Sequence, residues 1–329
     1  MTTLIPILGD QLSPWLSALD DADPADTVLL MMEVAEETGY VRHHKQKLAF
    51  ILSAMRHHAA ALQEAGWHLD YIRLDDPDST GSFTGEVARA VARHAPDRIV
   101  VTEAGEWRVA AMLESWQTLF GIPVEIRADT RFIASHADFE AWAKDRPDLV
   151  MEWFYRAMRQ RTGILMEGKR PAGDRWNFDK DNRKRAEADL LMPRPLAFAP
   201  DAITQEVLAM VETRFPDHPG TLDGFDYAVT AADAERQAEQ FFAHALADFG
   251  PFEDAVMTGD WTMAHSLLSA PLNLGLLDPR RVVDTVVAEY TAGRAPLASV
   301  EGFVRQVTGW RDYVWHMYWH LGEDYTAKS

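Results

Sequence analysis

The sequence predicts a doubly wound α/β domain with a parallel sheet at the N-terminus, followed by an all-α domain. Over roughly the first 130 residues, five short apolar runs rich in β-branched residues alternate with helical patterns, which is typical of parallel strands joined by helices. From Ile203 to its end the chain is helical in pattern. Its breaks lie at Pro216–Gly220, Gly250-Pro251 and Leu277–Pro279. We therefore expect three parts, residues 1–130, 131–202 and 203–329.

The elements of the first part can be placed one by one. The five apolar runs, which predict buried strands, are Thr3–Leu8, Thr27–Met32, Leu69–Arg73, Arg98–Thr102 and Val124–Ile126. The helical patterns between them are His43–Gly66, Gly85–Ala95 and Trp107–Phe120. The first strand runs into Gly9-Asp10-Gln11 rather than a Gly-x-Gly-x-x-Gly turn, so the sequence lacks the NAD fingerprint.

The middle part carries the chain's basic segment. Residues 135–165 are helical in pattern, and Lys169–Leu196 is a connector punctuated by proline and glycine. The stretch from Arg156 to Arg185 contains ten basic and four acidic residues, a local excess of six positive charges in a chain of net charge -19. The overall charge opposes non-specific nucleic-acid binding across the whole surface. This segment is either a DNA-binding patch or a solvated linker.

Composition limits the class of protein. Hydrophobic residues at 47% and charged residues at 25% are ordinary for a soluble protein of about two domains. No window is apolar enough to span a membrane and the start lacks a basic n-region, so the cytoplasm is the expected compartment. The absence of cysteine excludes disulfides, thiolate nucleophiles and cysteine-ligated metals within these residues.

Two stretches of the C-terminal half predict a nucleotide pocket. Ser266 and Ser269, three residues apart at the opening of a helix, can present hydroxyls and unpaired backbone N–H groups to an anion such as a pyrophosphate. A simple helix N-cap is the alternative. Arg305, Trp310 and Arg311 can bring guanidinium groups and an indole to another wall of the same pocket. Together they indicate a helical site for a flavin nucleotide.

These stretches, with three further motifs, resemble the cryptochrome/photolyase family. The three are Ile7–Ser13, Tyr40–Lys47 and Arg175–Arg183, and they look like the bacterial branch of (6-4) photolyases and related cryptochromes that carries an iron–sulfur cluster. Members of that branch hold a [4Fe–4S] cluster with four cysteines in their C-terminal third. Since this chain has none, we expect it to be a fragment, with the family's catalytic histidines beyond Ser329.

The resemblance implies FAD in the helical half. The residues that it implies as FAD contacts are Phe252, Ser266, Leu267, Leu268, Ser269, Asn273, Arg305, Trp310 and Arg311. Phe252 can equally be a core residue. Gln306 stands where many photolyases place a glutamate that contacts the lesion, and Trp315 and Trp319, four apart on one helix face, are expected to pack in the core.

The resemblance also implies an antenna chromophore, 6,7-dimethyl-8-ribityllumazine, at the carboxyl ends of the strands. Its expected contacts are Gly9, Asp10, Gln11, Glu33, Val34 and Glu37. Asp10 could instead cap a turn, and Glu33 could be solvated. His43 and His44 are interpreted as surface or pocket-rim residues, since neighbours on a helix point apart.

Damaged DNA is the implied partner. Trp176 can stack or wedge, Arg183 can meet phosphate, and Asp179 is a candidate ligand for a divalent cation beside the DNA. A mere inter-domain linker is the alternative for this segment.

The expected function is light-driven electron transfer from reduced FAD to a (6-4) photoproduct, which this fragment should not complete unaided. We expect FAD binding to be weak or lost and the lumazine site to be intact, because the α/β domain is complete. A blue-light sensor without repair activity and an adenine-nucleotide-binding α/β protein are the competing hypotheses. The sequence predicts no oligomeric state.

Overall fold

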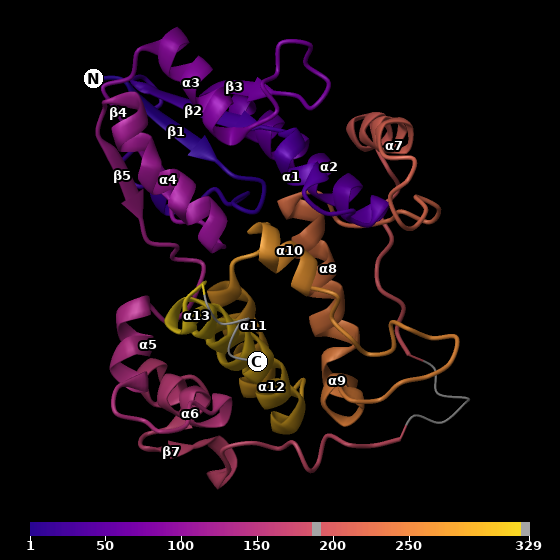
Figure 1. Cartoon of the computed structure of the whole chain (residues 1–329). Helices are drawn as coiled ribbons and strands as arrows, with labels where there is room; N and C mark the ends of the chain where they lie inside the picture. Colours follow the sequence, from indigo (N-terminus) through magenta and orange to yellow (C-terminus); the bar gives the residue numbers. More distant parts are fainter. Residues whose placement is uncertain (186–191, 324–329) are drawn as a thin grey trace. The chain divides into compact units, whose positions relative to one another are not determined.

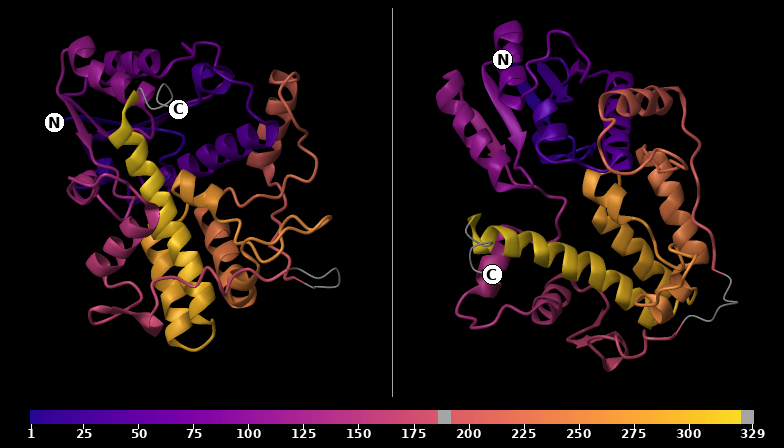
Figure 2. Two further views of the ribbon diagram at one scale, coloured as in Figure 1. Left: turned by 60° about the horizontal axis from the view of Figure 1, so that its bottom comes forward. Right: turned by 45° about the vertical axis from the view of Figure 1, so that its right-hand side comes forward.

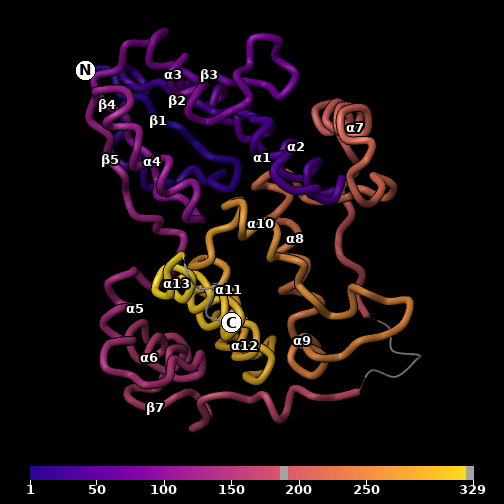
Figure 3. The backbone as a smooth tube through the Cα atoms, in the orientation of Figure 1, coloured from indigo at the N-terminus to yellow at the C-terminus, as the bar shows by residue number. Residues whose placement is uncertain are grey.

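The computed structural model describes residues 1–185 and 192–323, which form two compact units (Figure 1). The α/β unit comprises Met1–Thr130, Ala197–Ala234 and Pro271–Leu276, and the helical unit comprises Arg131–Leu196, Glu235–Ala270 and Leu277–Ser329. Each unit is therefore built from stretches that are far apart in the sequence, as the colours of the tube in Figure 3 let the reader follow. The division into 1–130, 131–202 and 203–329 stays a prediction.

A five-stranded parallel sheet of order β3-β2-β1-β4-β5 forms the centre of the α/β unit. Its strands are β1 (Thr3–Ile7), β2 (Thr27–Met32), β3 (His68–Ile72), β4 (Arg98–Thr102) and β5 (Val124–Arg127). Every residue of β1 and β2 is buried, which explains their uninterrupted apolar sequences. The strand order reverses between β1 and β4, the place where open α/β sheets bind ligands. The predicted fold class is confirmed.

Helices cover both faces of this sheet. The helices that connect the strands are α1 (Ala35–Gly39), α2 (Lys45–Glu64), α3 (Phe83–His94) and α4 (Trp107–Phe120). One face shares a core with α3 and α4 that contains Leu4, Val28, Leu30, Val87, Ile99, Val101, Leu113 and Trp116. Because strand side chains alternate, Ile5, Leu29 and Val100 point to the opposite face, and they are buried as well. The predicted ranges of α2 and α4 agree within two residues, whereas the short α1 was not predicted.

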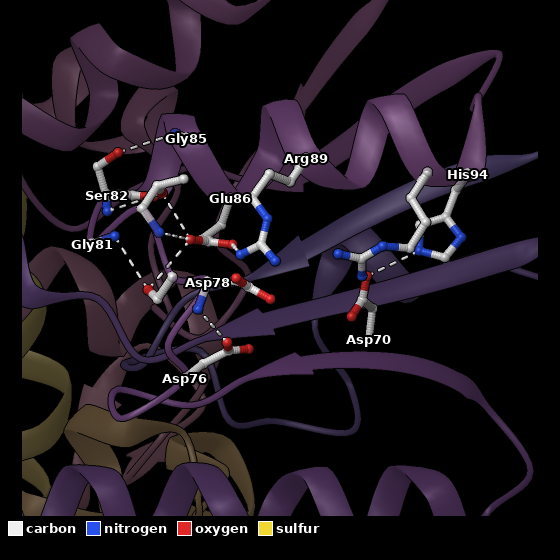
Figure 4. Close-up of polar contacts among 12 residues, drawn as sticks. Asp70, Asp76, Asp78, Gly81, Ser82, Gly85, Glu86, Arg89 and His94 are labelled. Carbon is white, nitrogen blue, oxygen red and sulfur yellow. Dashed lines mark hydrogen bonds and ion pairs between the residues drawn. The ribbon is translucent and has the colours of Figure 1, made fainter.

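The loop before α3 is closed by a buried glutamate (Figure 4). Glu86 accepts hydrogen bonds from the backbone N–H of Thr80 at 2.5 Å and from its hydroxyl at 2.7 Å, and it pairs with Arg89 at 2.7 Å. Ser82 caps α3 by accepting a hydrogen bond from the N–H of Gly85 at 3.1 Å. The helix therefore begins two residues before the predicted start at Gly85.

The stretch Ala197–Ala234 joins the α/β unit through α7 (Ala202–Arg214), which packs along α2. Lys45 of α2 donates to Glu212 at 2.8 Å, and His57 lies 3.3 Å from the carboxylate of Asp201, the residue that caps α7. These two polar contacts hold α7 against α2.

The helical unit is built from short helices. Those of its middle stretch are α5 (His136–Ala143) and α6 (Met151–Thr162), followed by a small hairpin of β6 (Met166–Glu167) and β7 (Arg170–Pro171). The remaining elements are α8 (Ala231–His244), α9 (Leu246–Phe252), α10 (Ser269–Leu274), α11 (Pro279–Thr291), α12 (Leu297–Val304), a π-helical segment η3 (Arg305–Arg311) and α13 (Asp312–Leu321). Helices α8 and α10 contain residues of both units.

Several expectations for this half need correction. The chain is not continuously helical from 135 to 165, and the predicted break at Gly250-Pro251 falls inside the last turn of α9, after which the chain is not helical until Ser269. The break at Leu277–Pro279 is observed, because Asp278 caps α11 and Pro279 is its first residue. Residues 186–191 of the predicted connector and the last six residues of the chain lie outside the described ranges.

The helices α12, η3 and α13 follow one another without a break and form the long yellow rod of Figure 2. The π-helical turn brings Gly309 against α6, where an added Cβ would lie 3.1 Å from the sulfur of Met151 and 3.4 Å from the ring of Tyr155. π-helical turns often mark functional positions. Among residues 1–185 and 192–323, no helix combines the length and the apolar character that a membrane span requires.

Asp312 at the start of α13 fastens the rod to the segment before α5. Its carboxylate is fully buried and accepts a hydrogen bond from the backbone N–H of Ala134 at 2.7 Å. Burial raises the pKa of Asp312 to about 6, although this hydrogen bond and the charge of Arg311 act in the opposite direction. The charged form of this side chain therefore costs free energy in the folded protein.

That raised pKa predicts a pH dependence of stability. A carboxyl whose pKa is higher in the folded than in the unfolded state stabilises the fold at low pH, and this contribution is lost as the pH rises through 6. We expect the free energy of unfolding to fall by about 1 kcal/mol more between pH 5 and pH 8 in the wild type than in Asp312→Asn, which keeps an acceptor for Ala134 but carries no charge. Urea unfolding at both pH values measures this difference. Equal pH dependence in the two proteins would contradict it.

Candidate ligand-binding site

A cavity of about 260 Å³ lies in the α/β unit where β1, β2 and β4 end. Its walls are the turns after these strands, together with α1, α2 and the first turns of α3 and α4. The lining residues that belong to the strand ends and α1 are Leu8, Gly9, Asp10, Met32, Glu33, Val34, Glu37, Thr38, Tyr40, Gly105 and Glu106. The others are His43, Lys47, Leu48, Ile51, Leu52, Met55, Phe83, Val109 and Leu274. This is the sheet edge at which parallel α/β folds bind small molecules.

Helix α2 supplies much of the apolar wall. Lys47, Ile51 and Met55 are spaced four residues apart and so lie along one stripe of the helix, with Leu48 and Leu52 beside them. Gly9 faces this stripe at close range, since an added Cβ would lie 3.1 Å from the sulfur of Met55 and 3.5 Å from Ile51. Apolar walls with a few polar groups are typical of sites for ring-bearing ligands.

The polar rim of the cavity is dominated by carboxylates. Glu37 accepts a hydrogen bond from Arg108 at 2.6 Å, and the same guanidinium donates to Glu106 at 2.5 Å. Arg108 also lies over the ring of Tyr40, 5.1 Å from its centre. Burial raises the pKa of Glu37, while the hydrogen bond from Arg108 opposes that rise. A ligand that donates hydrogen bonds suits this rim better than an anion does.

Glu33 fixes the floor of the cavity. It is buried at the end of β2 and accepts hydrogen bonds from Nε and Nη2 of Arg56 at 2.7 and 3.0 Å. The hydroxyl of Tyr71 donates to it at 2.7 Å and the backbone N–H of Leu74 at 2.9 Å. Burial disfavours the charge on Arg56, but the hydrogen bonds and charge of Glu33 outweigh it and raise the pKa of Arg56. Burial beside Glu33 also raises the pKa of Tyr71.

A second polar cluster lies inside the helical unit, around Arg305 at the start of the π-helical turn. Arg305 lies 3.1 Å from Glu253, 3.5 Å from Glu301 and 3.5 Å from Asp179. Burial raises the pKa of Glu253 to about 7, although the charge of Arg305 opposes this. The guanidinium group of Arg305 is therefore surrounded by carboxylates of its own chain.

The comparisons with known proteins fit this geometry. A family model for deoxyribodipyrimidine photo-lyase-related proteins matches residues 5–227, which is more than half of the chain and includes all strands and helices around the cavity except α10. The chain belongs to this family. A (6-4) photolyase of Agrobacterium fabrum (strain C58) is 50% identical over 329 residues, which is 100% of this chain and 65% of that protein.

Two further relatives of this photo-lyase-related chain are more distant. An uncharacterized protein of Acanthamoeba polyphaga mimivirus is 38% identical over 74 residues, which is 22% of this chain and 57% of that protein. The crystal structure of a bacterial class III photolyase from Agrobacterium tumefaciens matches with a TM-score of 0.62 at 13% identity, over 98% of this chain and 60% of that one, and it shows the fold alone. The chain thus spans less than two thirds of the length of both photolyases.

Five of the six residues implied for the antenna chromophore line the cavity of this family member. Gly9, Asp10, Glu33, Val34 and Glu37 are among its walls. Gln11 is not; it is fully buried and donates hydrogen bonds to the carbonyls of Thr102 and Glu103 at 3.2 and 3.1 Å. Gln11 therefore ties the end of β1 to the end of β4. The alternative that Glu33 is solvated is wrong, because its side chain is buried, accepts internal hydrogen bonds and lines the cavity.

Sequence reasoning missed most of the other walls. On α2, the residues Lys47, Ile51 and Met55 repeat every four positions, and this spacing was the one signal in the sequence for that wall of the cavity. His43 lines the rim of the cavity, as interpreted. His44 is exposed at the surface, as interpreted, and it also caps α2 by accepting a hydrogen bond from the N–H of Gln46. Phe83 and Leu274 give no such signal, because only the tertiary fold brings residues so far apart in the chain to one cavity.

The residues implied for FAD belong to both units, and all but Asn273 lie in the helical unit. In the helical unit, Phe252 is the last residue of α9. The next residue, Glu253, accepts a hydrogen bond from Arg305 through its carboxylate, and its backbone carbonyl lies 3.2 Å from the ring of His265. Ser266 follows His265, so three of the implied segments adjoin through Glu253. The Ser266 hydroxyl accepts a hydrogen bond from the N–H of Leu268 at 3.3 Å, a local turn. Asn273 is exposed and belongs to the α/β unit.

The implied FAD residues differ in their local surroundings. The hollow that Ser266 lines holds about 20 Å³, enough for about one water molecule. Leu268 is buried, Leu267 adopts a left-handed backbone conformation with φ of 55°, and Ser269 is exposed as the first residue of α10. Trp310 is exposed at 43%, and Arg311 donates to the carbonyl of Arg131 at 2.9 Å. The FAD contacts stay predictions.

Trp315 and Trp319 are packed against aromatic neighbours of the helical unit. Trp315 stacks on Phe132 with ring centres 4.1 Å apart, and Trp319 meets Trp315 edge-on at 5.7 Å. Both residues therefore pack against other aromatic rings as expected, but they are half-buried rather than part of the core.

The residues implied for DNA lie together in the helical unit. Trp176 is half-buried, and Arg183 is exposed and forms an ion pair with Asp179. Asp179 also faces Arg305, so two guanidinium groups meet its carboxylate. Within residues 1–185 and 192–323, no group of three or more metal-ligating side chains is placed to hold a metal ion. The cation at Asp179 and the DNA contacts stay predictions.

Proposed function

We propose that the chain is part of a photolyase/cryptochrome-like flavoprotein, and that the cavity of its α/β unit binds the light-harvesting chromophore. Family membership and 50% identity to a (6-4) photolyase support the class of protein. The observation that carries the chromophore assignment is the cavity itself, which lies at the sheet edge expected for a ligand and collects five of the six implied residues.

The lining favours an uncharged chromophore that donates hydrogen bonds, and we propose 6,7-dimethyl-8-ribityllumazine. The apolar stripe of α2 suits an aromatic ring, and the rim carboxylates of Asp10 and Glu37 suit ring N–H and ribityl hydroxyl groups. Glu33 and Glu106 add two more carboxylates to the walls, which makes four. The cations that face them in the described part of the chain are three, namely Lys47 in the lining, Arg56 paired with Glu33, and Arg108 shared by Glu37 and Glu106, so the walls keep a negative excess. A phosphorylated ring compound would be repelled by this charge pattern.

The finer functional assignment is light-driven repair of a (6-4) photoproduct in DNA, with reduced FAD as the electron donor in the complete protein. The identity to a protein named as a (6-4) photolyase supports this proposal. Damaged DNA is the proposed partner, through Trp176 and Arg183, and the cytoplasm is the proposed compartment. In this account the protein places the chromophores and the DNA, and the flavin supplies the redox chemistry.

Fluorescence titration of the purified chain with the lumazine, and in parallel with riboflavin 5′-phosphate, tests the proposal. We expect one lumazine per chain and at least about tenfold weaker binding of the phosphorylated flavin, since one repulsive contact of about 1.4 kcal/mol suffices for that ratio. Glu37→Gln should bring the affinities for the two ligands closer together, because it removes a negative charge that repels the phosphate. Equal affinity of the wild type for both ligands would contradict the charge argument, and no lumazine binding would contradict the assignment of the cavity.

A further inference from the structure

Aromatic and guanidinium side chains alternate in a ladder on the helical unit. Arg156 lies over the rings of Trp153 and Trp176, 4.7 and 5.5 Å from their centres. Arg159 lies over Trp176 at 5.5 Å and over Tyr155 at 5.6 Å. Such contacts stabilise each ring–cation pair and fix the orientation of the indoles. The ladder links α6 to the segment after β7.

The ladder runs from the interior to the surface. Tyr155 and Arg159 are buried, and the side chain of Arg159 donates to the carbonyls of Trp176 and Leu165. Trp176 and Arg156 are half-buried, whereas Trp153 is 51% exposed. Arg156 is further held by Glu152 at 2.7 Å, and Asn177 donates to the same carboxylate at 3.0 Å. The outermost indole is therefore presented to solvent on a rigid base.

The stretch that follows α6 in the sequence differs in charge from the chain as a whole. The chain carries a net charge of -19. The exposed basic residues of the stretch from 161 to 185 are Arg161, Lys169, Arg170, Arg175, Lys180, Arg183, Lys184 and Arg185, against the exposed acidic residues Glu167, Asp174 and Asp181. Basic side chains interleaved with a stacking aromatic are typical of surfaces that hold unpaired nucleotides.

We propose that Trp153, supported by Arg156 and Trp176, is a stacking site for an unpaired base of DNA, with basic residues of the stretch from 161 to 185 holding phosphates of the same strand. The inference rests on the proposed function for the identity of the nucleic acid, but it requires neither light nor a bound chromophore. Trp153 was not among the residues implied for DNA by the sequence. The rigid guanidinium beneath the indole lowers the entropy cost of stacking, because the ring is already oriented.

Binding of a fluorescein-labelled oligothymidylate by the full chain in the dark tests this site. Trp153→Ala should weaken binding about tenfold, as expected for the loss of one base–aromatic stack. It should leave the dependence of affinity on salt unchanged, because no phosphate contact is lost. Trp153→Phe should retain most of the affinity. Trp261→Ala removes an even more exposed tryptophan, 76% accessible, from the same unit and should have no effect.

Other results would overturn the proposal. Affinity of Trp153→Ala equal to that of the wild type, an equal loss in Trp261→Ala, or no binding of the oligonucleotide by the wild type would each do so. If Trp153→Ala also weakened the binding of poly-glutamate tenfold, the surface would be a site for acidic peptides instead. Because the assay uses undamaged DNA in the dark, its outcome is independent of lumazine binding and of repair, which test the proposed function separately.

Discussion

Gly9→Leu is expected to weaken lumazine binding to the α/β unit about 100-fold. A side chain at this position would point at Met55 and Ile51, both of which line the cavity, and leucine would extend into the space between them. The leucine side chain would occupy cavity space that the ring of the lumazine needs. A clash of about 2.8 kcal/mol with the ligand gives the 100-fold loss, since each 1.4 kcal/mol changes an affinity tenfold. Fluorescence titration of the chain with the lumazine measures the effect.

Gly9→Ala is the matched control. Its Cβ would lie 3.1 Å from the flexible thioether of Met55, which can move by a few tenths of an ångström, so we expect a change in affinity of no more than about threefold. The two variants should unfold at similar urea concentrations, because Gly9 has no positive φ that only glycine tolerates. If leucine at this position binds the lumazine as tightly as alanine does, the ligand does not occupy this cavity.

Glu33→Ala is expected to lower the free energy of unfolding of the α/β unit by about 3–5 kcal/mol. It removes the acceptor of four hydrogen bonds and leaves the buried guanidinium of Arg56 without its partner. The phenol of Tyr71 and the backbone N–H of Leu74 lose their acceptor as well. Urea unfolding followed by circular dichroism measures the loss.

Two further variants make this result interpretable. Glu206→Ala removes a side chain that is 55% exposed and lies 3.7 Å from the same arginine, and it should cost less than about 1 kcal/mol. Glu33→Gln keeps an acceptor for Tyr71 or Leu74, so its loss in free energy of unfolding should lie between those of Glu33→Ala and Glu206→Ala. If Glu33→Ala does not fold, Glu33→Gln should still do so and can be measured in its place. A loss in Glu33→Ala no larger than in Glu206→Ala would mean that Glu33 does not anchor the cavity floor.

The sheet was predictable because of how its strands are buried. Parallel strands covered on both faces, such as β1 and β2, must be apolar throughout, and that leaves runs of Val, Ile, Leu and Met that are visible in the sequence. The long helix α4 was predicted at its observed bounds. The antenna residues followed from the rule that ligands bind at strand ends, combined with the resemblance to photolyases.

Other features depend on contacts that the sequence does not display. Gln11 turns inward because two carbonyls at the end of β4 need a donor, and Leu274 reaches the cavity from the far end of the chain. Arg305 is implied as an FAD contact, and the sequence does not show that the fold surrounds its guanidinium group with carboxylates from three separate segments. The contact of Arg156 with the ring of Trp176 as well as that of Trp153 likewise depends on the placement of Trp176 beside α6. Tertiary packing decides each of these cases.

A crystal structure of the chain grown with saturating 6,7-dimethyl-8-ribityllumazine would test the central claim, that the cavity of the α/β unit is the chromophore site. The account predicts density for one bicyclic ring against Ile51 and Met55, with its polar groups toward Asp10 and Glu37. An empty cavity with the lumazine bound elsewhere, or no bound lumazine at all, would contradict it.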